Sequence, residues 1–124
     1  MKRNWDTIRE LLIKIEECTL PTENVRLNQF PKERAAEISY HIRLLIDAGL
    51  INGRISETLD PEVKDFFASS LTWHGHELLD IIRSNQVWEK TKSTFLEKGI
   101  EMTFDLVKNG ATQIAAAILK ATIP

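Results

Sequence analysis

The sequence contains a single cysteine, Cys18, among its 124 residues. One thiol cannot form an intramolecular disulfide, and it cannot supply a four-cysteine zinc site. Cys18 stands at the end of an amphipathic stretch, a position that favours a buried structural thiol over a reactive one. The cysteine content therefore excludes a disulfide scaffold, and a chain of this length suits one domain with its own hydrophobic core.

Long hydrophobic runs are also lacking. Met1-Lys2-Arg3 is followed by a mixed-charge segment, so no secretory signal is visible. The most apolar run, residues 111–123, is too short to span a bilayer and is interrupted by Gln113 and Lys120. These features predict a cytoplasmic protein without a membrane segment.

The motifs of common enzyme classes are missing. We find no P-loop, GxGxxG or GxSxG pattern and no cysteine nucleophile with a nearby base, which predicts that the protein is not an enzyme and needs no cofactor. His74 and His76 lie two residues apart, so on a helix their side chains diverge by about 200°. A zinc site needs three or four converging ligands, and we expect no metal here. The alternative interpretation is a strand-to-helix joint, with Thr72 as the helix cap and Gly75 allowing close packing.

A strong excess of either charge is lacking too. The formal net charge is −2, with nine Lys/Arg against eight acidic residues before residue 55 and seven against ten after it. A nucleic-acid binder usually presents a basic surface. The charge balance leaves DNA binding open without supporting it.

Five segments show the apolar spacing of amphipathic helices: residues 4–18, 31–48, 73–84, 87–98 and 103–120. Gly49 and Gly99 suit the ends of two of these helices. Residues 25–29 predict a short strand or a poorly formed helical turn, and Asn52-Gly53 predicts a two-residue turn or hairpin between Leu50-Ile51 and Ile55. A polar stretch with a helical turn over 63–67 then leads to a strand at Leu71-Thr72.

This order predicts a mainly α (α+β) fold, a winged helix-turn-helix with a small β-hairpin wing and two additional C-terminal helices. We expect a winged-helix domain at residues 1–85. Residues 86–124 would form a helical extension that either packs on this domain within one compact whole or makes a dimer contact.

Two segments carry a resemblance to known proteins. Residues 38–51, ISYHIRLLIDAGLI, resemble the recognition helix and following strand of many bacterial regulators, and Leu71-Thr72 with Gly75 is similar to the LTxxG pattern that follows them. Together with the residues around Trp5 and those from Gly75 to Trp88, they resemble a bacterial and phage family, domain of unknown function 2513, over about residues 1–108. That family usually has an acidic residue at the position of His74. The resemblance implies the fold and a phage or mobile-element setting, and it implies no established activity.

The predicted recognition helix supplies the candidate DNA contacts. Its outward face carries one arginine and three acids, whereas a major-groove reader normally presents Arg, Lys, Asn or Gln. The candidates on and around this helix, in the wing and at the start of the chain are Lys2, Arg3, Lys32, Arg34, Ser39, Tyr40, His41, Arg43, Asn52 and Arg54. Leu44 and Ile46 are apolar where regulators commonly carry charge, which favours a covered surface or a partner contact.

The last predicted helix has an apolar stripe that includes Phe104, Val107, Ile114 and Ile118. Either this stripe completes the monomer's own core, or it forms a homodimer or partner contact.

Two functions follow as hypotheses. The first is a winged-helix protein that binds double-stranded DNA, a transcription regulator of a phage or mobile element, and it depends mostly on fold analogy. The alternative is a protein–protein interaction or assembly module that retains the winged-helix fold without DNA binding, which the acids on the recognition face and the near-neutral charge favour.

Overall fold

The computed structural model describes residues 1–56 and 63–122. The chain forms two compact units, Met1–His76 and Glu77–Pro124. The boundary between them falls inside a helix, nine residues before the division at 85/86 that the sequence suggested. Each unit is described separately below.

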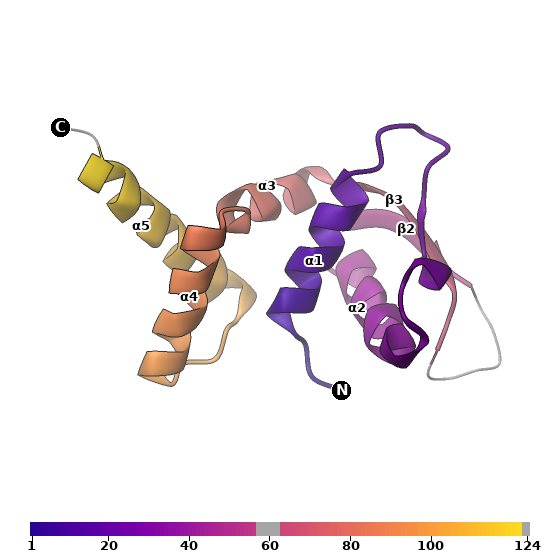
Figure 1. The fold of residues 1–124 in the computed structure, drawn as a ribbon, viewed down its shortest axis with the longest axis horizontal. Helices are drawn as coiled ribbons and strands as arrows, with labels where there is room; N and C mark the ends of the chain where they lie inside the picture. The colour runs from indigo at the N-terminus through magenta and orange to yellow at the C-terminus, as the bar shows by residue number, and fades with distance from the viewer. Residues whose placement is uncertain (57–62, 123–124) are drawn as a thin grey trace. The chain divides into compact units, whose positions relative to one another are not determined.

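The described part of the first unit contains helices α1 and α2, strands β1, β2 and β3, and the start of α3 (Figure 1). Helix α1 spans Trp5–Glu16, and its N-cap is Asn4, whose side-chain oxygen accepts hydrogen bonds from the backbone N–H groups of Asp6 (2.9 Å) and Thr7 (3.2 Å). Strand β1 is only Val25–Arg26 and runs directly into a 3₁₀ turn, η1, at Leu27–Gln29. The sequence left a short strand and a helical turn as alternatives for this stretch, and the structure contains both.

Helix α2 spans Ala35–Asp47 and follows a second 3₁₀ turn, η2, at Lys32–Arg34. The predicted helix began at Pro31, so its first turn is 3₁₀ rather than α. Gly49 ends the helix with a φ of 72°, a left-handed conformation that glycine adopts without steric cost. The predicted glycine stop is therefore confirmed.

The sheet is antiparallel and has the order β1-β3-β2, with β2 at Ile51–Ile55 and β3 at Phe66–Leu71. The predicted turn at Asn52-Gly53 is wrong, because both residues lie inside β2 and pair with β3. A bulge falls between them, and a Cβ at position 53 would lie 2.5 Å from the carbonyl oxygen of Phe67. Gly53 thus serves close strand approach and not a turn.

The predicted helical turn at 63–67 is wrong as well. Phe66 and Phe67 begin β3, and residues 63–65 belong to no helix. Phe66 and Ala68 are buried while Phe67 between them is exposed, which is the two-residue alternation of a half-buried strand. The remainder of the predicted polar loop, residues 57–62, lies outside the described residues.

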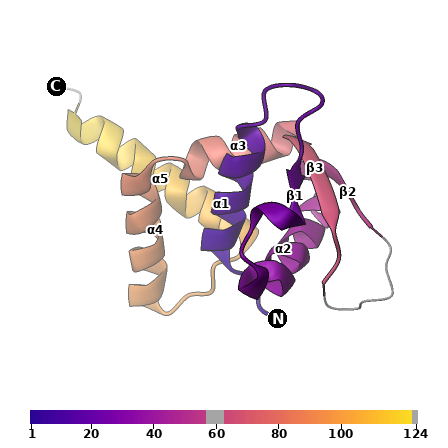
Figure 2. The ribbon, with the colours of Figure 1, turned by 45° about the vertical axis from the view of Figure 1, so that its right-hand side comes forward.

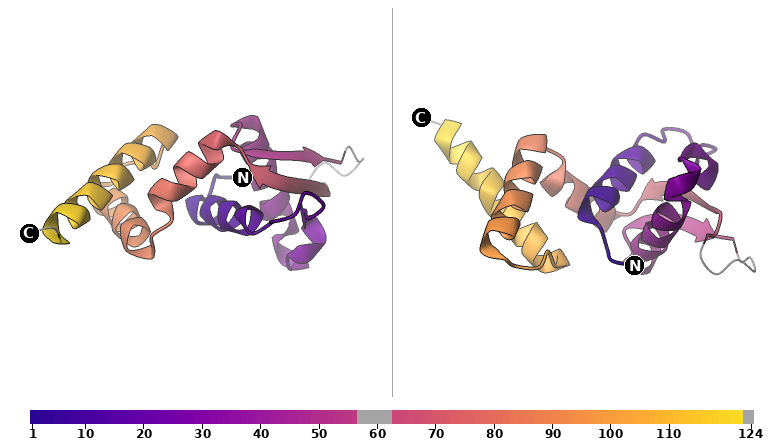
Figure 3. Two further views of the ribbon diagram at one scale, coloured as in Figure 1. Left: turned by 90° about the horizontal axis from the view of Figure 1, so that it is seen from above. Right: turned by 60° about the horizontal axis from the view of Figure 1, so that its bottom comes forward.

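The core of the first unit lies between the sheet and the two helices, which cover the same face of the sheet (Figure 3). Its fully buried side chains include Leu11, Leu12, Ile15, Ile38, Ile42, Phe66 and Ala68. The apolar spacing of both helices predicted their buried faces, Ile38, Ile42 and Leu45 on α2 among them.

Helix α3, Trp73–Ile82, starts at a joint that ties three segments of the first unit together. The Thr72 backbone N–H donates to the Leu50 carbonyl (3.0 Å), and the Thr72 hydroxyl donates to the Gly49 carbonyl (2.6 Å) and accepts from the Gly75 N–H (3.1 Å). A Cβ at position 75 would overlap the Leu50 carbonyl oxygen. The predicted roles of Thr72 as cap and Gly75 as a close-packing residue are confirmed.

The second unit consists of the end of α3 with helices α4, Asn85–Lys98, and α5, Phe104–Thr122 (Figure 2). Helix α4 is capped by Ser84 and ends at Gly99, which has a φ of 65°. Helices α4 and α5 pack on each other, with Gly110 beside the Phe95 ring. Gly110 lies within α5, and the helix runs through it without a break.

Within the described residues, no helix is long and apolar enough to cross a membrane. The structure is mainly helical with one small sheet, consistent with the predicted α+β class.

Candidate nucleic-acid interface

The outward face of α2 borders a hollow of about 500 Å³ within the first unit. Helix α2 provides one side of it and residues next to the β2–β3 connection provide the other; the lining is Met1, Ala36, Ser39, Tyr40, Arg43, Ile55 and Lys64. None of these described lining residues is acidic. The hollow therefore combines two cations and a phenol, a donor set suited to an anionic ligand.

Ser39 joins the two sides of the hollow. Its side-chain oxygen donates to the Lys64 carbonyl and accepts from the Lys64 N–H, both at 3.0 Å. Ser39 is only 6% exposed, so it holds the Lys64 backbone against α2 instead of contacting a ligand itself. Sequence reasoning missed Lys64, because nothing in the polar stretch before β3 indicates that a buried serine on α2 fixes it.

Tyr40 and Arg43 reach the hollow as predicted for residues of the outward face. Tyr40 is half-buried and its ring meets that of His41 edge-to-face, with centroids 5.4 Å apart. Arg43 is exposed. These two side chains and Lys64 are polar residues in the described lining of the hollow.

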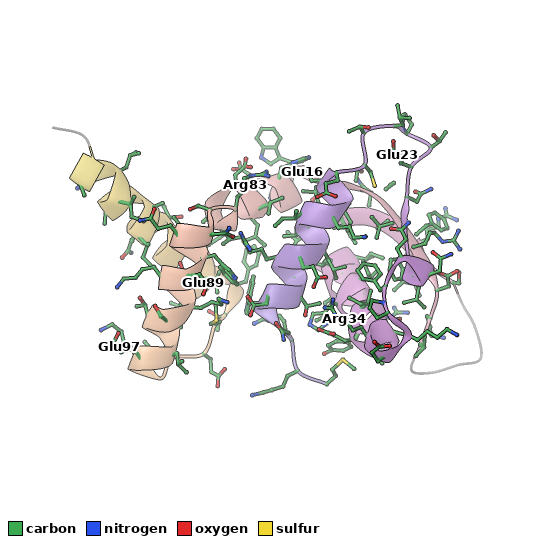
Figure 4. All side chains as sticks on the ribbon, in the orientation of Figure 1. Glu16, Glu23, Arg34, Arg83, Glu89 and Glu97 are labelled. Carbon is green, nitrogen blue, oxygen red and sulfur yellow. The ribbon has the colours of Figure 1, made fainter. Side chains whose placement is uncertain are left out.

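Arg34, which is labelled in Figure 4, is instead held by two carboxylates of the first unit. Its guanidinium donates to both carboxylate oxygens of Glu10 (2.8 and 2.9 Å) and to Glu37 (3.0 Å). Hydrogen bonds from Arg34 and from the Thr7 hydroxyl lower the pKa of the Glu37 carboxyl, and the same carboxylates raise the pKa of Arg34. Arg34 thus joins α1 to the start of α2, a role that its predicted place at the DNA interface did not foresee.

His41 is 1% exposed and has hydrogen bonds at both ring nitrogens. Its predicted role as a direct DNA contact conflicts with this burial, because a ligand cannot reach the ring in this conformation. Consecutive residues of a helix are rotated by about 100° around its axis. His41 therefore lies on the inner side of α2, although Tyr40, the residue before it, lines the hollow.

Asn52 and Arg54 lie on the sheet face that points away from α2. Arg54 pairs with Phe67 across β2 and β3, and Arg26 pairs with Phe67 from β1, so one row on the exposed face reads Arg26, Phe67, Arg54. Arg26 is bound to Asp65 at 2.6 Å. The predicted wing residues therefore do not join the hollow, whose strand residue is the oppositely directed Ile55.

The remaining predicted DNA contacts, Lys2, Arg3 and Lys32, are exposed. The Arg3 guanidinium lies 5.1 Å from the centroid of the Trp5 ring, and Lys32 is part of η2. Lys2 follows Met1, which lines the hollow, and Arg3 comes next in the sequence.

The predicted partner contacts are mostly covered by the chain itself. Leu44 and Ile46 are half-buried, Val107 is fully buried, and Phe104, Ile114 and Ile118 are half-buried. Val107 is therefore unavailable to a partner. The more exposed apolar residues of α5 are Leu106 (45%) and Leu119 (62%).

The two histidines at the start of α3 are both exposed. His76 Nδ1 lies 3.8 Å from a carboxylate oxygen of Glu16, too long for a hydrogen bond. No group of three His, Cys, Asp or Glu side chains converges within residues 1–56 and 63–122.

The fold and the hollow define a small α+β protein with a basic, aromatic-lined depression beside an exposed helix. A sequence profile of the family described as "Hypothetical protein (DUF2513)" matches residues 2–101, and the chain belongs to this family. A protein of Haemophilus influenzae (strain ATCC 51907 / DSM 11121 / KW20 / Rd), described as "Uncharacterized protein", is 37% identical over 119 residues, which cover 96% of this chain and 99% of that protein. No solved structure matches significantly. The family expected from the sequence motifs is confirmed, and α5 lies beyond the residues that the profile matches.

Proposed function

We propose that this protein is a winged-helix protein that binds double-stranded DNA through the outward face of α2. The observation that carries the proposal is the hollow, because Arg43, Lys64 and Tyr40 line it together. Cations placed in this way can contact phosphates, which supply most of the non-specific affinity for DNA.

The order of elements supports the winged-helix assignment. Helix α2 leads directly into β2, and β2 pairs with β3 in an antiparallel arrangement. A recognition helix followed by a wing has the same order of elements. One departure is clear: between β1 and α2 the chain has two 3₁₀ turns where a helix-turn-helix has a full helix. The proposal therefore depends on the chemistry of the hollow more than on the helix-turn-helix pattern.

The first test is binding to a random duplex at low salt, followed by fluorescence anisotropy. We expect a shift at micromolar protein and an affinity that falls steeply with salt. Arg43→Ala and Lys64→Ala should each reduce the slope of log affinity against log salt by about 0.9, the value for one lost phosphate contact. Lys98→Ala, in the last turn of α4, is the matched control and should leave the slope unchanged. Absence of any change in anisotropy at micromolar protein would contradict the proposal.

A role in transcription regulation follows only if the protein prefers one DNA sequence over others. Selection from a random duplex library should enrich one motif, since transcription regulators discriminate their sites from other DNA by several kcal/mol. The phage or mobile-element setting implied by the resemblance stays a prediction.

A second candidate is the protein-interaction module, and one observation favours it. Trp73 at the start of α3 is 76% exposed, and large aromatic side chains are enriched at protein interfaces. If a purified partner is found, Trp73→Ser should abolish the complex and leave the thermal melt unchanged. A complex that survives this substitution would remove Trp73 from the interface.

A further inference from the structure

The segment before α1 reaches the hollow at Met1, and two cations follow Met1 in the sequence. Met1 is part of the lining, and Lys2 and Arg3 follow it with exposed side chains. Each residue of extended chain spans at most about 3.5 Å, so the Cα atoms of Lys2 and Arg3 stay within about 7 Å of the Cα atom of Asn4. The position of Asn4 therefore limits where the side chains of Lys2 and Arg3 can lie.

Asn4 is fixed to α2 by the buried ring of His41. The Asn4 backbone N–H donates to His41 Nε2 at 2.8 Å, and His41 Nδ1 lies 2.7 Å from the Glu37 carbonyl oxygen. Since a carbonyl can only accept, Nδ1 carries the proton, and Nε2 must be the unprotonated acceptor for the Asn4 N–H. Both ring nitrogens are thus satisfied in the neutral form.

The hydrogen bond between His41 and Asn4 restrains the segment before α1 and is not needed for the α1 cap. Asn4 already caps α1 through its side chain, and this cap would form with or without His41. What His41 adds is a hydrogen bond to the backbone at the point where the chain enters α1, 37 residues away in the sequence. Arg3 is further restrained, because its guanidinium lies 5.1 Å from the centroid of the Trp5 ring.

We propose that His41 is a positioning residue for nucleic-acid binding: it holds the basic segment, Lys2 and Arg3, beside the hollow, so that both cations contact phosphates of the duplex that Arg43 and Lys64 engage. This inference rests on the proposed function. It assigns to His41 an indirect role in place of the direct contact that the sequence predicted.

The salt dependence of duplex binding separates this role from a purely structural one. Loss of two phosphate contacts reduces the slope of log affinity against log salt by about 1.8. When salt rises from 50 to 200 mM, the factor by which affinity falls should therefore be about tenfold smaller for the Lys2→Ala/Arg3→Ala variant than for the wild type. Unfolding of part of the sample lowers the active fraction and leaves the slope unchanged. Lys14→Ala/Lys90→Ala, which also removes two positive charges, is the control and should keep the wild-type slope.

Two substitutions at position 41 test the anchor itself. Glutamine places a side-chain carbonyl near the position of Nε2 and keeps an acceptor for Asn4, whereas asparagine reaches only the position of Nδ1 and keeps the bond to Glu37 alone. We expect His41→Gln to retain the wild-type slope and His41→Asn to reproduce the reduced slope of the Lys2/Arg3 variant. A second pair approaches the contact from the other side: Asn4→Pro removes the N–H and the cap, and Asn4→Ala removes only the cap, so only the proline variant should lose slope.

The outcomes are distinct. No duplex binding by the wild type would overturn the proposed function, and this inference with it. Binding with an unchanged slope in the Lys2→Ala/Arg3→Ala variant would overturn the inference and leave the proposed function standing, as would an equal loss of slope in the Lys14/Lys90 control. A reduced slope in the Lys2→Ala/Arg3→Ala variant, together with wild-type slopes for His41→Asn and Asn4→Pro, would overturn the role of His41. Should His41→Asn fail to fold, the Asn4 pair decides the anchor.

Discussion

Thr72 is the residue at which the two sequence motifs of the first unit meet, and its replacement gives a measurable prediction. Thr72→Ala removes one hydroxyl that has two partners, the Gly75 N–H at 3.1 Å and the Gly49 carbonyl at 2.6 Å. Loss of the helix cap costs about 1 kcal/mol. Loss of the bond to Gly49 costs about 1 kcal/mol more. We therefore expect the free energy of unfolding to fall by about 2 kcal/mol.

Thr72→Ser is the matched control, because it keeps the hydroxyl and deletes only a methyl group of a half-buried side chain. We expect it to cost no more than about 0.8 kcal/mol. Urea unfolding followed by far-UV circular dichroism measures both variants, and the slope with urea should not change if only stability is altered. Thr112→Ala removes a hydroxyl that bonds a carbonyl within α5 and should have little effect. Equal costs for alanine and serine at position 72 would refute the assignment of two hydrogen bonds to this hydroxyl.

Three further predictions concern the first unit. Gly75→Ala should lower the free energy of unfolding by about 3 kcal/mol, more than Thr72→Ala, because its Cβ would overlap the Leu50 carbonyl oxygen; urea midpoints test the order. Glu37→Gln should flatten the loss of stability in acid. The lowered pKa of Glu37 means that its contribution is present above the pKa of the unfolded chain and is lost as pH falls through the folded value, so melts from about pH 6 to pH 3 should converge with the wild type at the acid end. Asn4→Ala should cost about 1 kcal/mol in urea unfolding through loss of the α1 cap, and a cost near zero would contradict the capping geometry.

The helices were predictable because a 3.6-residue repeat of apolar side chains is a strong local signal. Residues 5–16 and 35–47 form helices inside the predicted ranges, and Gly49 and Gly99 end helices as expected. The strands were less predictable. Asn52-Gly53 has the composition of a tight turn, yet Gly53 is needed where the backbone of β3 approaches too closely for a side chain. Pairing with a distant strand outweighed the local turn preference.

The candidate site was predicted in part for the same reason. A helical repeat indicates which residues of α2 face outward, and this identified Tyr40 and Arg43. It cannot indicate that Arg34 meets Glu10, 24 residues earlier, or that Ser39 binds the backbone of Lys64, 25 residues later. These contacts depend on how the elements pack, and they turned predicted ligand contacts into structural ones.

The net charge of −2 is a weaker argument against DNA binding than it looked from the sequence. At physiological salt, charges interact over about 8 Å, so a phosphate in the hollow is affected mainly by the charged groups nearest to it, Arg43 and Lys64 among them. The same screening separates the hollow from the row of Arg26, Phe67 and Arg54, which lies on the other face of the sheet. A duplex docked on α2 would gain little from Arg54, and an affinity alone would not reveal which face it occupies. The slope of affinity with salt counts phosphate contacts directly, so single substitutions on each face locate the bound duplex.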